Sequence, residues 1–295
     1  MIFSAKNVKL RLNTVDILAN QCTLSIQAGL DPRYDAGSRH SRDYFAQQGI
    51  GSRLNFSHYL TGNLDDIKKL VSAQGEMIGN DGMSNEGQIV SGSFGGMVFT
   101  SGYLSSYSIQ FTPNSPVVAN SEVVFFDDLT GNFVQTEEAA PKEEILNCKN
   151  ITFTNSSSSE IGEINDFITA SYNYTSEINP VYMAGTTVPE RIYFGRKNVS
   201  MSIDVDNPTG YVPYNGITAN FGFNMTKHNS STFVEAFSCY GRLQSRTVQA
   251  SVGGKVTHQL GIVTHNPHST HKVFGIKPVD RPVTSDVVGV PRNLL

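Results

Sequence analysis

Three kinds of residue are scarce in this 295-residue sequence: it contains no tryptophan, 3 cysteines and only 16% charged residues. The missing tryptophan counts against a carbohydrate-binding platform, because such platforms commonly stack sugars on large aromatic rings. The odd number of cysteines and their wide spacing argue against a disulfide scaffold. Cys22, Cys148 and Cys239 are instead expected to be small buried hydrophobic residues in a reducing compartment.

Long basic runs and long apolar runs are also missing. The 22 basic and 26 acidic side chains give a net charge of -4, and no Lys/Arg cluster is present that could neutralise a row of phosphates. This charge pattern argues against tight nucleic-acid binding but leaves room for passive contact with DNA. No apolar run of membrane-spanning length occurs and the first ten residues show no export signal, so we expect no membrane partner.

Known catalytic signatures are absent as well: there is no nucleophile elbow, phosphate-binding loop or dinucleotide fingerprint. Neighbouring carboxylates on a strand point to opposite faces, so no acidic pair predicts an acid/base site; the pairs are Asp65-Asp66, Asp127-Asp128 and Glu143-Glu144. His265, His268 and His271 are spaced like metal ligands, but Pro267 lies among them and no acidic or cysteine partner is near, which favours exposed turn residues. We therefore expect no catalytic residue, no cofactor and no metal.

Ser, Thr, Asn and Gly are abundant, and much of the chain shows the period-two alternation of β-strands. Turn residues separate the strand candidates at short intervals, which favours a sandwich or barrel. One helix is predicted, at residues 63–72, from a capping asparagine and one apolar face. The strand candidates are residues 8–12, 22–28, 52–60, 96–100, 103–111 and 122–126 in the first half, and 166–174, 199–205, 218–225, 234–239, 243–252 and 255–263 in the second.

The most informative feature is an internal repeat. A segment that begins at Gly102 matches one that begins at Gly241, 139 positions later, without a gap for about twenty-five residues. The matched pairs are Leu104 with Leu243, Ser106 with Ser245, Ile109 with Val248, Gln110 with Gln249, Val117 with Val256 and Val124 with Val263. A looser match aligns Thr23 and Ser25 with Thr169 and Ser171. Two copies are too few for a solenoid, so the chain is predicted to hold two complete domains.

The predicted fold class is all-β, with two tandem β-sandwich or barrel domains. The first domain spans residues 1–134 and carries the flanking helix, and the second spans residues 150–266. An acidic linker is expected at residues 135–149, and an extended arm at residues 267–295. The helix of the second copy is expected to be shortened or lost, because Pro213 and Gly216 interrupt it.

Residues 75–96 form a glycine-rich stretch that is longer than a normal connection inside a domain. Its apolar side chains would be costly to leave exposed, which favours a loop that orders against a neighbouring subunit over a loop that stays in solvent. These side chains are Met77, Ile78, Ile89, Val90 and Phe94.

The repeated strand carries a small, neutral, hydrogen-bonding face in both copies. Its members are Ser106, Ser108 and Gln110 in the first copy, opposite Tyr103, Tyr107, Ile109 and Phe111, and Ser245, Thr247 and Gln249 in the second. An ordinary solvent-exposed sheet face is the simpler interpretation. The recurrence also fits the wall of a wet channel in which a polyanion slides, because a basic wall would hold DNA by counterion release.

Each half shows a strand pair ending in Thr-Gly, an intervening helix or loop, and then Gly-(Tyr/Arg)-Leu-x-Ser, Ile/Val-Gln and a valine-rich strand. The key strings begin at Ser101-Gly102-Tyr103-Leu104 and at Cys239-Tyr240-Gly241-Arg242-Leu243. Over about 230 residues this pattern resembles the bacteriophage tail tube proteins.

The resemblance implies a virion structural protein and not an enzyme, with β-sandwich domains that pair their sheets into rings around a DNA-conducting lumen. It would place the protein in the virion tail and, during assembly, in the host cytoplasm. The polar face would be the lumen, and residues 75–96 the loop that stacks successive rings. Because two copies share one chain, a trimer with pseudo-sixfold symmetry is expected, or else a hexamer, with other tail proteins as partners and passive contact with phage DNA.

Two further functions fit the sequence. The first is a distal tail, baseplate or capsid-decorating structural protein, which would form isolated oligomers instead of tubes. The second is a β-sandwich glycan-binding module or hydrolase, which would be a monomer with an acidic cleft.

Overall fold

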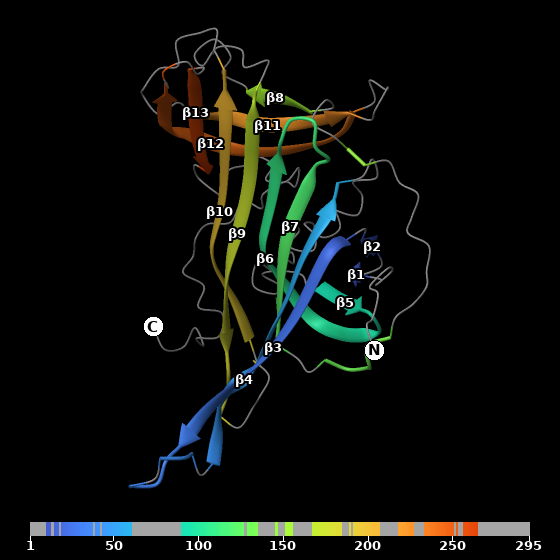
Figure 1. Ribbon diagram of the computed structural model, residues 1–295, viewed down its shortest axis with the longest axis vertical. Helices are drawn as coiled ribbons and strands as arrows, with labels where there is room; N and C mark the ends of the chain where they lie inside the picture. The colour runs from blue at the N-terminus through green and yellow to red at the C-terminus, as the bar shows by residue number, and fades with distance from the viewer. Residues whose placement is uncertain are drawn as a thin grey trace, which may run out of the picture.

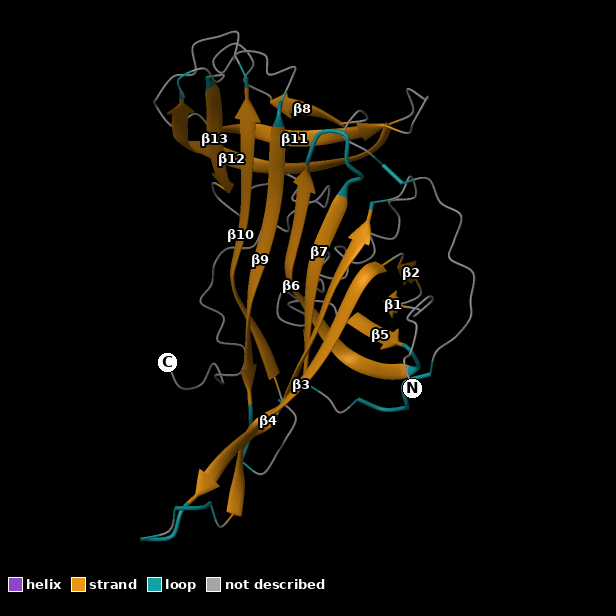
Figure 2. Ribbon diagram, viewed as in Figure 1, coloured by secondary structure: helices purple, strands orange, loops and turns teal. Residues whose placement is uncertain are grey.

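The computed structural model describes residues 10–12, 15–17, 19–37, 39–41, 43–60, 90–126, 129–134, 145–146, 151–155, 167–184, 189, 191–206, 218–226, 233–250, 252 and 256–264. In this part of the chain every regular element is a β-strand (Figure 2), and the strands pair in antiparallel fashion. The predicted all-β class is therefore confirmed. The predicted helix at residues 63–72 and the predicted arm at residues 267–295 lie outside the described residues.

Both halves contribute strands of very unequal length (Figure 1). In the first half they are β1 (Leu10–Leu12), β2 (Val15–Ile17), β3 (Ala19–Arg33), β4 (Asp43–Tyr59), β5 (Val90–Phe94), β6 (Met97–Phe111) and β7 (Val118–Phe125). In the second half they are β8 (Ile151–Asn155), β9 (Thr169–Val181), β10 (Arg191–Val205), β11 (Thr218–Thr226), β12 (Phe233–Gln249) and β13 (Thr257–Thr264). The longest are β4 and β12, with 17 residues each.

Apart from β2, which pairs with β1 and has no counterpart among the described strands of the second half, the two halves pair their strands in the same order. The order is β1-β5-β6-β7-β4-β3 in the first half and β8-β11-β12-β13-β10-β9 in the second. In each half one long, curved strand, β6 or β12, pairs with different neighbours along its length, so the sheet bends there (Figure 1). A direct pairing of β6 with β9 then joins both halves into a continuous run of eight strands, β3-β4-β7-β6-β9-β10-β13-β12.

The repeat seen in the sequence has a counterpart in the pairing of the strands. Every pair of the β12–β13 ladder lies 139 positions after a pair of the β6–β7 ladder, from Gly102 with Phe125, matched by Gly241 with Thr264, onward. Even the bulge recurs, at Ser105 in the first half and at Gln244 in the second. Such bulges bend a strand and increase its twist, which suits a strand that turns a corner.

The earlier, looser match was wrong by two residues. Thr23 pairs with Asn55, which is linked through β7 to Ser106. The residue linked in the same way to Ser245 is Ser171, and not Thr169. Positions in β3 and β9 therefore correspond with an offset of 148 because the loops between the matched segments differ in length.

Gly102 does not end a strand, although the sequence pattern suggested one strand at residues 96–100 and another at 103–111. It lies inside β6, where it pairs with Val90 on one side and Phe125 on the other. A Cβ atom at this position would lie 2.7 Å from the carbonyl oxygen of Val90 and 2.8 Å from Cγ1 of Val123. The glycine thus permits close approach at the bend of one continuous strand. The predicted strands at residues 234–239 and 243–252 likewise merge into β12.

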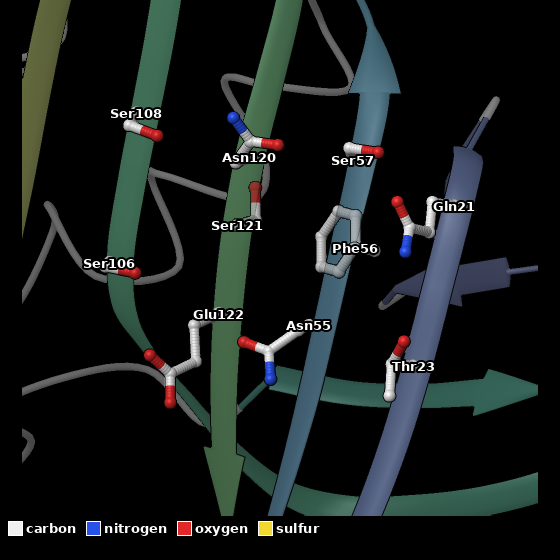
Figure 3. Close-up of a pocket in the computed structure, with 10 residues that line it drawn as sticks. All are labelled: Gln21, Thr23, Asn55, Phe56, Ser57, Ser106, Ser108, Asn120, Ser121 and Glu122. Carbon is white, nitrogen blue, oxygen red and sulfur yellow. The ribbon is translucent and has the colours of Figure 1, made fainter.

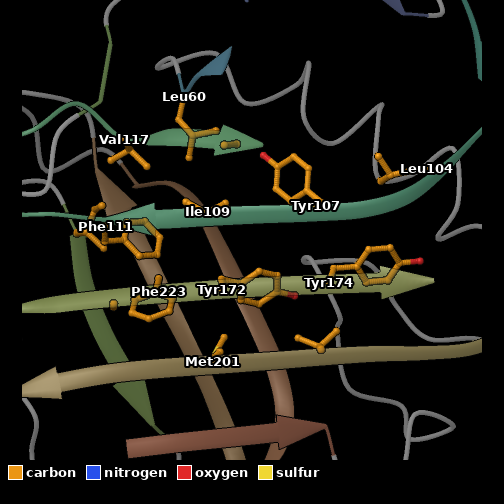
Figure 4. Packing of buried hydrophobic residues seen from close by; sticks show 14 of the residues in the cluster. Leu60, Leu104, Tyr107, Ile109, Phe111, Val117, Tyr172, Tyr174, Met201 and Phe223 are labelled. Carbon is orange, nitrogen blue, oxygen red and sulfur yellow. The ribbon is translucent and has the colours of Figure 1, made fainter. Parts of the chain in front are cut away.

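In the described residues the two halves share one hydrophobic core. Phe111 of β6 contacts Phe223 of β11, with ring centroids 4.7 Å apart, and Tyr172 of β9 lies fully buried beside them (Figure 4). Leu146 lies in the stretch predicted as a linker, yet it is 1% exposed and its backbone N–H donates to the carbonyl of Leu60 at 2.9 Å. Because the residues around Leu146 are acidic, the sequence predicted an exposed linker and its burial was missed.

Two hairpins extend beyond the shared sheet, one from each half. Within the described residues, the outer part of β3 pairs only with β4 and the outer part of β9 only with β10. Both strands run past the predicted ends at residues 28 and 174, to Arg33 and Val181. Bulges lie where each hairpin leaves the sheet, near Gln27 and near Phe194, and they disturb the alternation on which the prediction depended.

Candidate functional site

The candidate site is one face of the eight-stranded run, referred to here as the polar face. On β6 the buried residues are Tyr107, Ile109 and Phe111, so the opposite face carries Ser106, Ser108 and Gln110. Across the junction these three pair with Thr175, Asn173 and Ser171 of β9. The polar face therefore passes without interruption from the first half into the second.

The second set of predicted residues lies on the same face. Ser245 pairs with Gly261 and Thr247 with Gln259 of β13, and these two pair in turn with Ser202 and Asp204 of β10. Ser245, Thr247 and Gln249 are all exposed. The structure thus gathers all six predicted residues on one surface of hydroxyl and amide groups, and their role as a lumen stays a prediction.

Charges on the polar face occur in both signs. Arg53 and Glu122 form an ion pair at 3.0 Å between neighbouring strands. In the second half the ladder places Arg242 and Asp204 on this face, and Asp204 accepts a hydrogen bond from the hydroxyl of Thr169. These four described residues supply two positive and two negative charges, so they form no basic patch for a polyanion.

The polar face contains a hollow of about 250 Å³ in the first half (Figure 3). Its lining residues are Gln21, Thr23, Asn55, Phe56, Ser57, Ser106, Ser108, Asn120, Ser121 and Glu122. Glu122 is the one carboxylate among them, and Arg53 pairs with it. Glycoside hydrolysis ordinarily needs two carboxyl groups, so this hollow offers no support for a hydrolase.

Tyr103 lies on a different face from the one predicted. Since Ser105 bulges out of the ladder, Leu104, and not Tyr103, shares the buried face with Tyr107. The hydroxyl of Ser105 donates to the carbonyl of Glu122 at 3.1 Å and so secures the bulge. Tyr103 packs instead against Phe126, with ring centroids 6.3 Å apart.

His58 is a buried titratable group that the sequence analysis missed. It is 3% exposed, and its ring centroid lies 5.7 Å from that of Phe56 and 6.1 Å from that of Tyr107. Its Nδ1 lies 3.4 Å from the carbonyl oxygen of Tyr59. Burial lowers the pKa of His58 to about 4, because the imidazolium form loses its hydration. The sequence offered one sign of this burial: His58 lies two residues after Phe56 and two before Leu60, so the alternation places all three on the buried face.

The predicted stacking loop extends less far than expected. Val90 and Phe94 belong to strand β5, where Val90 is fully buried and Phe94 packs against Phe133 with ring centroids 5.8 Å apart. The tight turn at Gly95 and Gly96, both with positive φ, then leads into β6. Met77, Ile78 and Ile89 lie outside the described residues.

The thiols and imidazoles singled out in the sequence show no metal-like arrangement in the part of the chain that the structure describes. Cys22 is half-buried on β3, and burial raises the pKa of its thiol to about 12. Cys148 and the histidines at 265, 268 and 271 lie outside the described residues. His258 is on β13, where Nδ1 lies 2.8 Å from Nη2 of Arg246.

Comparison with known proteins does not assign the chain to a family. No protein-family model and no curated protein sequence matches it. Among the described residues there is no helix long and apolar enough to cross a membrane.

Proposed function

We propose that this protein is a tail-tube-like structural component of a bacteriophage tail, built from two tandem units of tail-tube type. The observation that carries the proposal is the eight-stranded run, in which two units with the same strand order expose one continuous, charge-balanced polar face. That arrangement suits a wall and not a catalytic cleft.

The two free edges of the run support a closed ring as part of this proposal. Its end strands, β3 and β12, each leave one edge without a partner among the described strands. Free edges favour pairing with another chain, and a head-to-tail pairing builds a ring when the rotation between successive copies closes. Three copies would supply six units and give a trimer with pseudo-sixfold symmetry. The projecting hairpins would then be available to other tail proteins and to the next ring.

The composition of the polar face suits passage of DNA. Hydroxyl and amide groups from neighbouring strands, such as Ser108 with Asn120 and Asn173, form hydrogen bonds with water without capturing phosphates. A protein that neutralised many phosphates would release counterions and hold DNA in place. The polar face therefore favours a lumen in which DNA makes passive contact.

Negative-stain electron microscopy of the purified protein tests this function. We expect rings with a central opening, or hollow cylinders if the protein forms the repeating tube. Rings that never stack would favour a distal tail or baseplate component. A protein that stays monomeric under all conditions, as a glycan-binding module would, contradicts the proposal.

A pair of variants tests the lumen itself. Ser108→Lys combined with Thr247→Lys should add a basic band inside the ring, so that DNA is retained and released by salt, whereas the unmodified ring retains none. Val98→Lys serves as a matched control, because Val98 is 41% exposed and lies outside the eight-strand ladders. Equal DNA retention by both variants would argue against a lumen at the polar face.

A further inference from the structure

The internal junction between the halves is a template for a second junction between chains. On one side of β12 the residues from Ser245 to Gln249 pair with β13, and on the other side no described strand is present. Within the described residues, β3 likewise pairs with β4 alone. These two free edges occupy the same places in their units as the edges of β6 and β9, which pair with each other.

The β6–β9 pairing predicts the register in which the free edges of β12 and β3 would pair. Positions in β12 follow those in β6 by 139, and positions in β9 follow those in β3 by 148, as the ladders require. In the internal junction Ile109 pairs with Tyr172. The corresponding residues at the free edges are Val248 and Leu24.

Burial at the two kinds of edge supports this correspondence. Ile109 is 1% exposed at the internal junction, whereas Val248, in the equivalent position, is 54% exposed. Tyr174 is 6% exposed, whereas its equivalent Ile26 is 56% exposed. Two of the most exposed apolar side chains of the described chain are thus those that a neighbouring unit would cover. Placing both in water is unfavourable, and a second copy offers each edge its missing partner.

We propose that residues 245–250 of one copy pair antiparallel with residues 22–27 of a second copy, with Val248 opposite Leu24 and Ser245 opposite Gln27. This inference rests on the proposed function for its ring and adds the residues that close it. Thr247 then lies opposite Ser25 and Gln249 opposite Thr23, so the polar face continues across the boundary. On the other face Val248, Leu24 and Ile26 come together and seal the core.

Arg246 fits the same arrangement. It takes the place of Tyr107 and would lie opposite Ile26 of the second copy. Its guanidinium is within hydrogen-bonding distance of Nδ1 of His258 on its own sheet, with Nη2 at 2.8 Å and Nε at 3.2 Å. This contact keeps the guanidinium of Arg246 over β13, so its methylene groups can cover Ile26 of the second copy.

Disulfide trapping tests the register. In a background with Cys22→Ser, Cys148→Ser and Cys239→Ser, the pair Val248→Cys with Leu24→Cys should form intermolecular disulfides and a ladder of dimers and trimers. The matched control is Val248→Cys with Ile26→Cys, on the same face but two residues out of register. Opposite Cβ atoms are close and diagonal ones are not, so the first pair should cross-link ~10-fold faster. Equal rates, or faster cross-linking of the control, would overturn the register.

A second measurement does not depend on cysteine geometry. Ile26→Lys and Val248→Lys place a charge at exposed positions, so the isolated chain should keep its β-rich circular dichroism spectrum. Sedimentation velocity should show loss of the oligomer in each variant, while Val252→Lys, at a fully exposed position outside the proposed pairing, leaves the oligomer intact. Oligomers unchanged by both edge substitutions would contradict the inference.

The two proposals can fail separately. Hollow rings in electron micrographs without in-register cross-links would keep the tube-like function and refute this junction. In-register cross-links in an assembly without a central opening would keep the junction and refute the function.

Discussion

The edges of β6 and β9 are equivalent to those of β12 and β3, but among the described strands only the first two pair with each other. Where β6 meets β9, the apolar residues of both strands are buried. At the edges of β12 and β3, Val248 and Ile26, the equivalents of Ile109 and Tyr174, are about half exposed. The strand order and the bulge are the same in both halves. The comparison teaches that burial here depends on whether a neighbouring unit is present, and not on the local fold of either half.

Other positions have diverged between the halves. His58, buried in β4, corresponds to Val205 in β10, because each pairs with the matching residue of the next strand, Ala119 or His258. Tyr107 corresponds to Arg246 in the same way. The first half therefore carries a buried imidazole in its core where the second half carries a simple apolar side chain.

The largest effect is expected at the internal junction. Ile109→Ala removes apolar contacts from a fully covered site and should lower the free energy of unfolding by about 2–5 kcal/mol. Val248→Ala, measured in the monomeric Ile26→Lys background, should change it by no more than about 0.5 kcal/mol, because the site is exposed. Urea denaturation measures both. Similar losses of unfolding free energy at the two positions would show that the free edge of β12 is covered as well as the internal junction.

The pH dependence of stability should come next in size. The unfolded chain protonates His58 near pH 6.5, whereas the folded chain resists protonation down to about pH 4. The free energy of unfolding should therefore fall as the pH drops from 6.5 to 4, by up to about 3 kcal/mol, and be insensitive to His58 above this range.

The variant His58→Val copies the second half into the first and provides the control for this effect. It should remove most of the loss between pH 6.5 and 4 while preserving stability at neutral pH. Denaturant titrations at several pH values measure the slope. If the slope is the same in the variant, His58 is not the group responsible.

A smaller effect is expected at the bend of β6. Gly102→Ala brings a Cβ within 2.7–2.9 Å of atoms of Val90, Val123 and Phe99, so something must shift. We expect a cost of about 1–3 kcal/mol. Gly51→Ala is the matched control, since a Cβ there meets nothing within 4 Å. Thermal denaturation compares the two variants, and equal transition temperatures would show that the bend of β6 accommodates the added methyl group.

The smallest effect concerns the ion pair on the polar face. Glu122→Gln removes a pair in which the Arg53 side chain is 61% exposed, so the loss of stability should not exceed about 1 kcal/mol and should shrink in high salt. Urea denaturation at two salt concentrations measures it. A loss of several kcal/mol would mean that the pair is shielded from solvent in the assembled protein.

Several features could be predicted from the sequence because they are local. Period-two alternation marked most strands, and the match of Gly102 with Gly241 located equivalent ladder positions with the correct offset. The six polar residues of the repeated strand were placed on one face because alternation after the bulge is regular. The bulge itself, the continuous strand through Gly102 and the long hairpins were missed, because each interrupts the pattern from which strands are read.

The sequence by itself determined that the chain is all-β, that its two halves correspond, and that small polar residues recur at matched positions, because side-chain alternation and spacing are properties of single strands. Only the tertiary structure decided that β6 pairs with β9, that Leu146 and His58 are buried, and that the halves share one core. Those outcomes depend on which edges and faces meet across more than a hundred residues of chain, and no local pattern of side chains encodes that choice.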